Sequence, residues 1–174
     1  MNIYLFNIFR VVHIIAGVLW AGAAIAYFFF FRPTIQSIGP VGGQFMQNLI
    51  ERQRYPLFMK VTSLLTILAG GWLLWNISGG LNVVWISTGP GLGFTIGAVA
   101  AILAYINGIV FLSPRAVRIG ALGQQMAAAG GPPAPAQIEE MGRLEREQTR
   151  VEWWDFIMLM ISLVTMATTR YWLF

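Results

Sequence analysis

Four long apolar segments decide what this chain can fold into. They cover about residues 4–31, 56–77, 92–112 and 153–172, and each is long enough to cross a bilayer as a helix, which takes about 20 residues. A backbone in lipid must satisfy its own hydrogen bonds, so these spans are helices. Only 10% of the residues are charged, against roughly 25% in a water-soluble domain. We therefore predict an all-α fold, a four-helix antiparallel transmembrane bundle, with residues 1–174 as a single membrane domain.

The lysines and arginines are shared unevenly between the two sides of this bundle. Nine lie in or beside the two long loops, and the other two are Arg10 and Arg170. Because basic residues favour the cytoplasmic side, we expect both long loops in the cytoplasm and both termini outside, N-out and C-out. The second long loop is a predicted cytoplasmic linker at about 115–150, flexible and proline-rich at 127–137 and amphipathic-helical from 138. The expected location is the cell inner (plasma) membrane, with the first apolar segment retained because it is longer than a signal-peptide core.

The composition excludes several classes of function. The chain has no cysteine, so disulfides, thiolate zinc sites, iron–sulfur clusters and cysteine nucleophiles are ruled out. The formal net charge is +4, but the arginines flank apolar segments and form no single basic patch. We therefore expect membrane lipids as partners and no nucleic acid. No catalytic triad, phosphate-binding loop or paired-carboxylate motif is visible.

His13, the only histidine, lies inside the first apolar segment. It shares one helical face with residues that are small or aromatic, namely Gly17, Trp20, Ala24 and Tyr27. A face of this kind is expected to point into the bundle. Counting along antiparallel helices places Gly70, Gly97 and Met166 at the depth of His13, in the outer half of the membrane.

Two interpretations of this region remain open. An ionisable residue inside a membrane span is usually functional, which favours a ligand or proton-relay role for His13. The structural alternative is a neutral imidazole hydrogen-bonded to Thr165, Thr169 or Tyr27. In the same way, the glycines leave room either for close helix packing or for a flat ligand such as haem.

A haem b is the first cofactor that these residues suggest. With one histidine, ligation of the haem iron by two histidines of the same chain is excluded. The remaining possibilities are ligation by His13 and Met166, a five-coordinate iron with His13 alone, and a homodimer in which two His13 side chains bind one iron. Copper is the second candidate cofactor, because methionine thioethers favour Cu(I). Its metal ligands would be His13 and Met166. The alternative is that the methionines serve only as adaptable packing residues. The candidate cofactor-binding set is His13, Gly17, Trp20, Gly70, Gly97 and Met166.

Lys60 and Asp155 form a possible charged site on the cytoplasmic side. Ordinary ion pairing explains such residues at span ends. A proton or anion site is the functional alternative, because charges inside membranes tend to be functional.

Two stretches resemble a known family. The first, "RVVHIIAGVLWAGAAIAYFFFFRP", has a histidine, a W-x-G about seven residues on, and an apolar run closed by R-P. The second, "ERQRYPLFMKVTSLLTILAGGWLLW" at 51–75, has basic residues at its start and a glycine–tryptophan pair near its end. Both resemble the first two helices of copper-resistance protein D (CopD)-like membrane proteins and, more distantly, of HemJ-type protoporphyrinogen oxidases, which bind haem b. The resemblance implies a small helical membrane protein and covers about half the chain.

Only His13 and Trp20 carry over from those families residue by residue. The families usually have a further histidine in the third helix, where this chain reads "GAVAAILAYINGIVF", with Tyr105 and Asn107. Three functions remain as hypotheses: electron transfer or tetrapyrrole-related redox chemistry on a haem b bound by His13, copper handling or transport, and a cofactor-free accessory or scaffold subunit of a larger membrane complex. Whether the protein is an enzyme stays open.

Overall fold

The computed structural model describes residues 2–174 and is all-helical. Within these residues, four helices are long and apolar enough to cross a membrane, at Ile3–Ser37, Tyr55–Ile77, Gly89–Ala128 and Pro135–Tyr171. The predicted all-α class and the four candidate spans are thus confirmed. The elements in chain order are α1 (Ile3–Ala26), η1 (Tyr27–Phe31), α2 (Arg32–Ser37), α3 (Pro40–Glu51), α4 (Tyr55–Ile77), α5 (Val83–Ile86), α6 (Gly89–Asn107), η2 (Gly108–Leu112), α7 (Ser113–Ala128), α8 (Pro135–Thr168) and η3 (Thr169–Tyr171).

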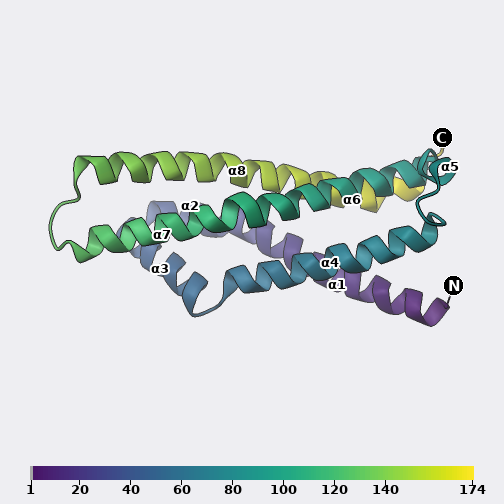
Figure 1. The fold of residues 1–174 in the computed structure, drawn as a ribbon, viewed down its shortest axis with the longest axis horizontal. Helices are drawn as coiled ribbons and strands as arrows, with labels where there is room; N and C mark the ends of the chain where they lie inside the picture. The colour runs from purple at the N-terminus through teal and green to yellow at the C-terminus, as the bar shows by residue number, and fades with distance from the viewer. Residues whose placement is uncertain (1) are drawn as a thin grey trace.

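The bundle is built from two helix pairs. α1 packs along α4, and α6 packs along α8, while the contacts between the two pairs are fewer. Both chain termini lie at one end, which we call the terminal end (Figure 1). The opposite end, which we call the loop end, carries α3 and the turn at residues 129–134 (Figure 1).

Two of the long helices continue past a proline, beyond the ends that we expected for them. We expected the first and third helices to end near residues 31 and 112, but they continue as α2 and α7 beyond Pro33 and Pro114. In both, a π-helical turn, η1 or η2, comes directly before, so that the N–H of Arg32 donates to the carbonyl of Tyr27 five residues earlier. A proline has no N–H and crowds the carbonyl four residues before it, and a widened turn relieves that crowding without breaking the helix.

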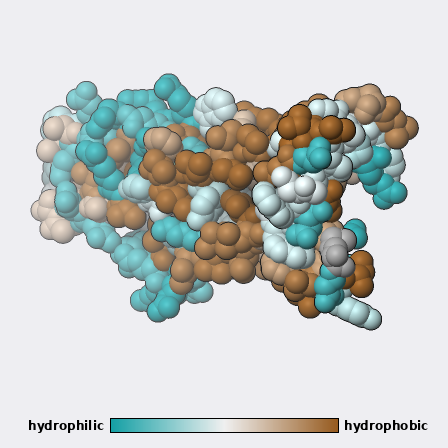
Figure 2. All heavy atoms as spheres, turned by 45° about the vertical axis from the view of Figure 1, so that its right-hand side comes forward, coloured by the Kyte–Doolittle hydropathy of each residue, from teal (hydrophilic) through white to brown (hydrophobic). Residues whose placement is uncertain are grey.

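The segment expected as a linker at 115–150 is mostly helical. α7 and the first half of α8 form a hairpin, and only residues 129–134 are non-helical. The helix expected from residue 138 is confirmed and begins at Pro135. At 1.5 Å per residue, the 40-residue helix Gly89–Ala128 is about 60 Å long, twice the roughly 30 Å of hydrocarbon. The hairpin therefore extends past the apolar part of the bundle, and Figure 2 shows hydrophilic residues gathered at that end.

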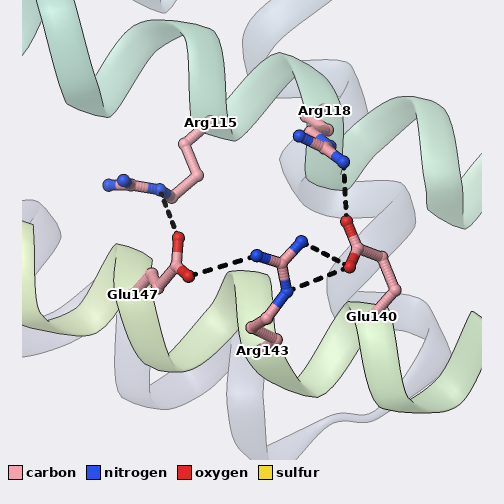
Figure 3. Close-up of polar contacts among 5 residues, drawn as sticks. All are labelled: Arg115, Arg118, Glu140, Arg143 and Glu147. Atoms are coloured by element: carbon pink, nitrogen blue, oxygen red, sulfur yellow. Dashed lines mark hydrogen bonds and ion pairs between the residues drawn. The ribbon is translucent and has the colours of Figure 1, made fainter.

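Ion pairs join α7 to α8 in this hairpin (Figure 3). Glu140 accepts from Arg118 Nη2 at 2.8 Å and from Arg143 Nη2 at 2.6 Å, and Arg115 Nε lies 3.5 Å from Glu147. The hydrogen bond from Arg143, together with the two nearby positive charges, lowers the pKa of the Glu140 carboxyl below its usual value. These ion pairs lie beside the buried side chain of Leu144, which is 3% exposed and supplies an apolar contact in the same hairpin.

Small residues fill the interior of the spans. The buried apolar residues include Ala16, Ala69, Ala100 and Ala104, while large aliphatic side chains such as Val18, 66% exposed, cover the outside. Small residues at helix contacts and large apolar ones facing outward are the arrangement of helices packed in lipid. Figure 2 shows hydrophobic residues covering the middle of the molecule.

The end of α8 is tied to the start of α6. The Thr169 hydroxyl, 1% exposed, donates to the Pro90 carbonyl at 2.8 Å, and the Gly89 N–H donates to the Phe174 carbonyl at 2.8 Å. The Gly89 N–H is one of the donors that the start of α6 would otherwise leave unpaired, and the Thr169 hydroxyl adds a second bond between the two helix ends.

Candidate functional site

His13 is held between α1 and α4. Its Nδ1 lies 2.8 Å from the backbone carbonyl oxygen of Thr66, one turn before Gly70. A carbonyl oxygen only accepts, so this contact requires the hydrogen on Nδ1, and in the neutral imidazole the lone pair is then on Nε2. The bond also fixes the orientation of the ring within an apolar span.

Gly70 allows the ring to come this close. A Cβ built on Gly70 would lie 2.6 Å from Cε1 and 2.7 Å from Nδ1 of His13, so any side chain there would displace the imidazole. One turn along α1, Gly17 faces the Thr66 side chain, whose methyl group would be 3.5 Å from a Cβ. The structure therefore brings together His13, Gly17 and Gly70, as their helical spacing and depth predicted.

The hydrogen-bond partners that we expected for His13 are wrong. Thr165 donates to carbonyls of its own helix, Thr169 donates to Pro90, and Tyr27 donates to Glu152. The reason is the pairing of the helices: α1 lies against α4 along its length, and its contacts with α8 are few. Equal depth in the bundle did not make these groups neighbours.

Met166 and Gly97 belong to the other helix pair. A Cβ on Gly97 would lie 2.7 Å from Met166 Cγ and 2.8 Å from Thr165 Oγ1. Ser162 Oγ lies 3.9 Å from the Met166 sulfur. The space beside Gly97 is thus filled by side chains of α8, and no described contact joins Met166 to His13. Trp20, 6% exposed, lies deeper on the α1 face, in the core with Ala101, Ala104 and Leu159.

A cavity of about 180 Å³ lies in the loop half of the bundle, among α1, α3, α4, α6 and α8. Trp20 lines it at one end, and residues of both π-turns, including Tyr27 and Gly108, line it further along. Its walls are mainly apolar, and a few polar groups converge on it. These are Tyr27, Tyr55, Lys60, Ser63, Tyr105, Ser113, Gln148, Glu152 and Asp155.

One buried ion pair stands beside this cavity. Arg32 Nε lies 3.1 Å from Glu152, with the two side chains 17% and 8% exposed. The Tyr27 hydroxyl and the Gln148 amide also donate to Glu152, each at 3.2 Å. The Glu152 carboxylate is therefore neutralised and well hydrogen-bonded, which a buried charge requires.

Lys60 and Asp155, the predicted charged pair, line the same cavity but form no ion pair with each other among the described residues. Asp155, 9% exposed, accepts a hydrogen bond from Asn107 Nδ2 at 3.2 Å. Both residues therefore line one space, in which Asp155 has an amide–carboxylate contact and no ion pair with Lys60.

Sequence reasoning missed the pairing of Arg32 with Glu152 and the role of Asn107. Each of these polar residues has apolar neighbours in the sequence. Arg32 is at the end of the first span, Asn107 near the end of the third and Glu152 at the start of the fourth. Their positions in the sequence could have indicated a shared polar site, since polar groups near the ends of several spans can meet at one depth in the membrane.

The methionines near the cavity contribute to packing. Met59, Met158 and Met160 contact the core cluster of Trp20 and Leu159. Among residues 2–174, no three histidine, aspartate or glutamate side chains come together in a way that could hold a metal ion. No protein-family model, curated protein or solved structure matches the chain.

Proposed function

We propose that this protein is a multi-pass membrane protein that binds a haem b through Nε2 of His13. The observation that supports the proposal is the hydrogen bond from Nδ1–H to the Thr66 carbonyl. Histidines that ligate metals almost always donate their other ring N–H to a carbonyl, a carboxylate or water, which fixes the tautomer and raises the basicity of the ligating nitrogen.

The residues around His13 are consistent with one ligand to a haem iron from this chain. The imidazole is partly exposed, and its orientation is fixed by Thr66 and Gly70. Haem b, when bound, would supply one-electron redox chemistry, and the resemblance of "RVVHIIAGVLWAG" to the haem-binding HemJ-type oxidases supports it. Met166, packed against Gly97, gives no support to a second ligand from the same chain. His13 would therefore be the one ligand that this chain supplies, and a second copy of the chain would be the source of any other.

The proposed topology has both termini outside the inner membrane. Figure 1 supports alternating helix directions, because both termini lie at one end and the turn at 129–134 at the other. Nine of eleven lysines and arginines belong to the loop half, which favours the cytoplasm for that end.

The experiment is spectroscopy of the full chain, expressed with ample haem and purified in mild detergent. A Soret band and a reduced α-band of b type are expected. His13→Ala should abolish both bands while circular dichroism stays helical. Met166→Leu, the matched control on the other helix pair, should leave them unchanged.

A colourless wild-type protein with no bound copper by metal analysis would refute both cofactor functions. The second candidate, a cofactor-free accessory subunit, would then stand. A specific observation favours it: the faces of Gly70 and Gly97 are each occupied by a side chain of the neighbouring helix, as in plain helix packing.

A further inference from the structure

We propose that the cavity in the loop half of the bundle is a binding site for a monovalent organic cation, an ammonium with an apolar body. This site is separate from His13, which does not line the cavity. The proposal depends on the walls of the cavity, on its charge balance and on its size.

Aromatic rings form much of the wall. Phe28 stacks on Phe156 with ring centroids 4.5 Å apart, and Tyr27 stacks on Tyr55 at 6.4 Å. The aromatic side chains that line the cavity are Trp20, Tyr27, Phe28, Tyr55, Tyr105 and Phe156. The faces of such rings carry partial negative charge and attract cations, and rings grouped around one space are the usual means of binding quaternary ammonium groups.

The charges in the cavity leave one buried carboxylate without a counter-ion. Glu152 is paired with Arg32 at 3.1 Å. Asp155 receives only an amide hydrogen bond from Asn107, and among the described residues no lysine or arginine lies within ion-pair distance of it. Removing an ion from water is costly unless a partner compensates it, and a bound cation beside Asp155 would provide that partner.

The space suits a ligand of one ring and a small head group. An apolar cavity of about 150 Å³ holds benzene. The cavity in this bundle measures about 180 Å³ and is partly open, so a benzylammonium-sized molecule can bind with its ring among the aromatic side chains and its charge near Asp155.

Lys60 gives the proposal a second, opposite test. It lines the same cavity, its side chain is exposed, and it forms no ion pair in the described residues. Its positive charge opposes a bound cation. Neutralising Lys60 should therefore strengthen cation binding, whereas neutralising Asp155 should weaken it.

The experiment measures the binding of benzylammonium to the purified full chain in a non-ionic detergent, by equilibrium dialysis at neutral pH. Ethylbenzene, which has nearly the same shape without the charge, is the control ligand. We expect Asp155→Asn to weaken binding of the cation at least tenfold, Lys60→Gln to strengthen it severalfold, and Glu140→Gln, an acidic residue outside the cavity, to change nothing. The neutral ligand should bind all four proteins alike.

Equal binding of the charged and neutral ligands by the wild-type protein would overturn the proposal, even if Asp155→Asn failed to fold. So would weaker binding of the cation by Lys60→Gln, because removal of a positive charge from the lining must favour a cation bound in the cavity. His13→Ala should bind the cation as the wild type does, so failure of the haem proposal and failure of this one are distinguishable.

Discussion

Replacing Gly70 with alanine tests how tightly His13 is held. The three atoms nearest to a Cβ at this position all belong to the imidazole, the closest at 2.6 Å. Carbon atoms in contact prefer about 3.5–4.0 Å, so the ring must move by about 1 Å and its 2.8 Å bond to the Thr66 carbonyl is lost. The structure thus predicts both overpacking and a broken hydrogen bond.

The expected loss of stability follows from three contributions. Overpacking costs about 1–3 kcal/mol, and the lost hydrogen bond costs about 0.5–1.5 kcal/mol. Alanine in place of glycine within a helix offsets about 1 kcal/mol of this. The net destabilisation of Gly70→Ala is therefore about 0.5–3.5 kcal/mol, measured as the free energy of unfolding by denaturing detergent in mixed micelles.

The next residue along α4 is the control. A Cβ on Gly71 has no atom within 4 Å, so Gly71→Ala should leave stability unchanged or raise it by up to about 1 kcal/mol. In a His13→Ala background the clash is gone, and Gly70→Ala should then cost nothing. Equal effects of the two alanines, or a cost that persists without the imidazole, would refute the close packing of His13 against Gly70.

Three further perturbations follow from buried or charged contacts. Arg32→Gln should destabilise the bundle by about 3–5 kcal/mol, because it leaves the Glu152 carboxylate, 8% exposed, without its partner. The double variant with Glu152→Gln should recover part of that loss. Both free energies of unfolding are measured in mixed micelles. Thr169→Val should cost about 1 kcal/mol by removing the bond to α6, whereas Thr168→Val, whose hydroxyl bonds only within its own helix, should be near neutral. The lowered pKa of Glu140 means that its contribution to stability is present above the unfolded value of 4.5 and is lost as the pH falls through the folded value. The protection factors of the hairpin amides, which are exchange rates corrected for the intrinsic effect of pH, should therefore fall in acid, and Glu140→Gln should abolish that change.

Much of the bundle could be predicted from periodicity and charge. The lengths of the apolar segments predicted the four candidate spans. The spacing of three and four residues along the first helix placed Trp20 in the core and His13 on the face that contacts Gly70. These features depend on the pattern of one helix at a time, to which the contact of His13 with Gly70 adds only a shared depth in the bundle.

The partners of each site residue could not be predicted in this way. Depth alone made Thr165, Thr169 and Met166 equal candidates to contact His13, but α1 pairs with α4, and those residues pack against α6. Which helices pair depends on the fit of small and large side chains across the whole interface. A count along single helices contains no such information.

The π-turn η1 shows how one extra residue changes a site. Continuing the His13 face in steps of three and four beyond Tyr27 would place Phe31 toward α8 and Arg32 to one side. In the structure the turn spans five residues, from the Tyr27 carbonyl to the Arg32 N–H, which brings Arg32 to the position that Phe31 would have taken. Arg32 is 17% exposed and pairs with Glu152, whereas Phe31 is 36% exposed. Because Pro33 favours the widened turn, a proline just beyond the expected end of the first helix supports the one buried ion pair beside the cavity in the described chain.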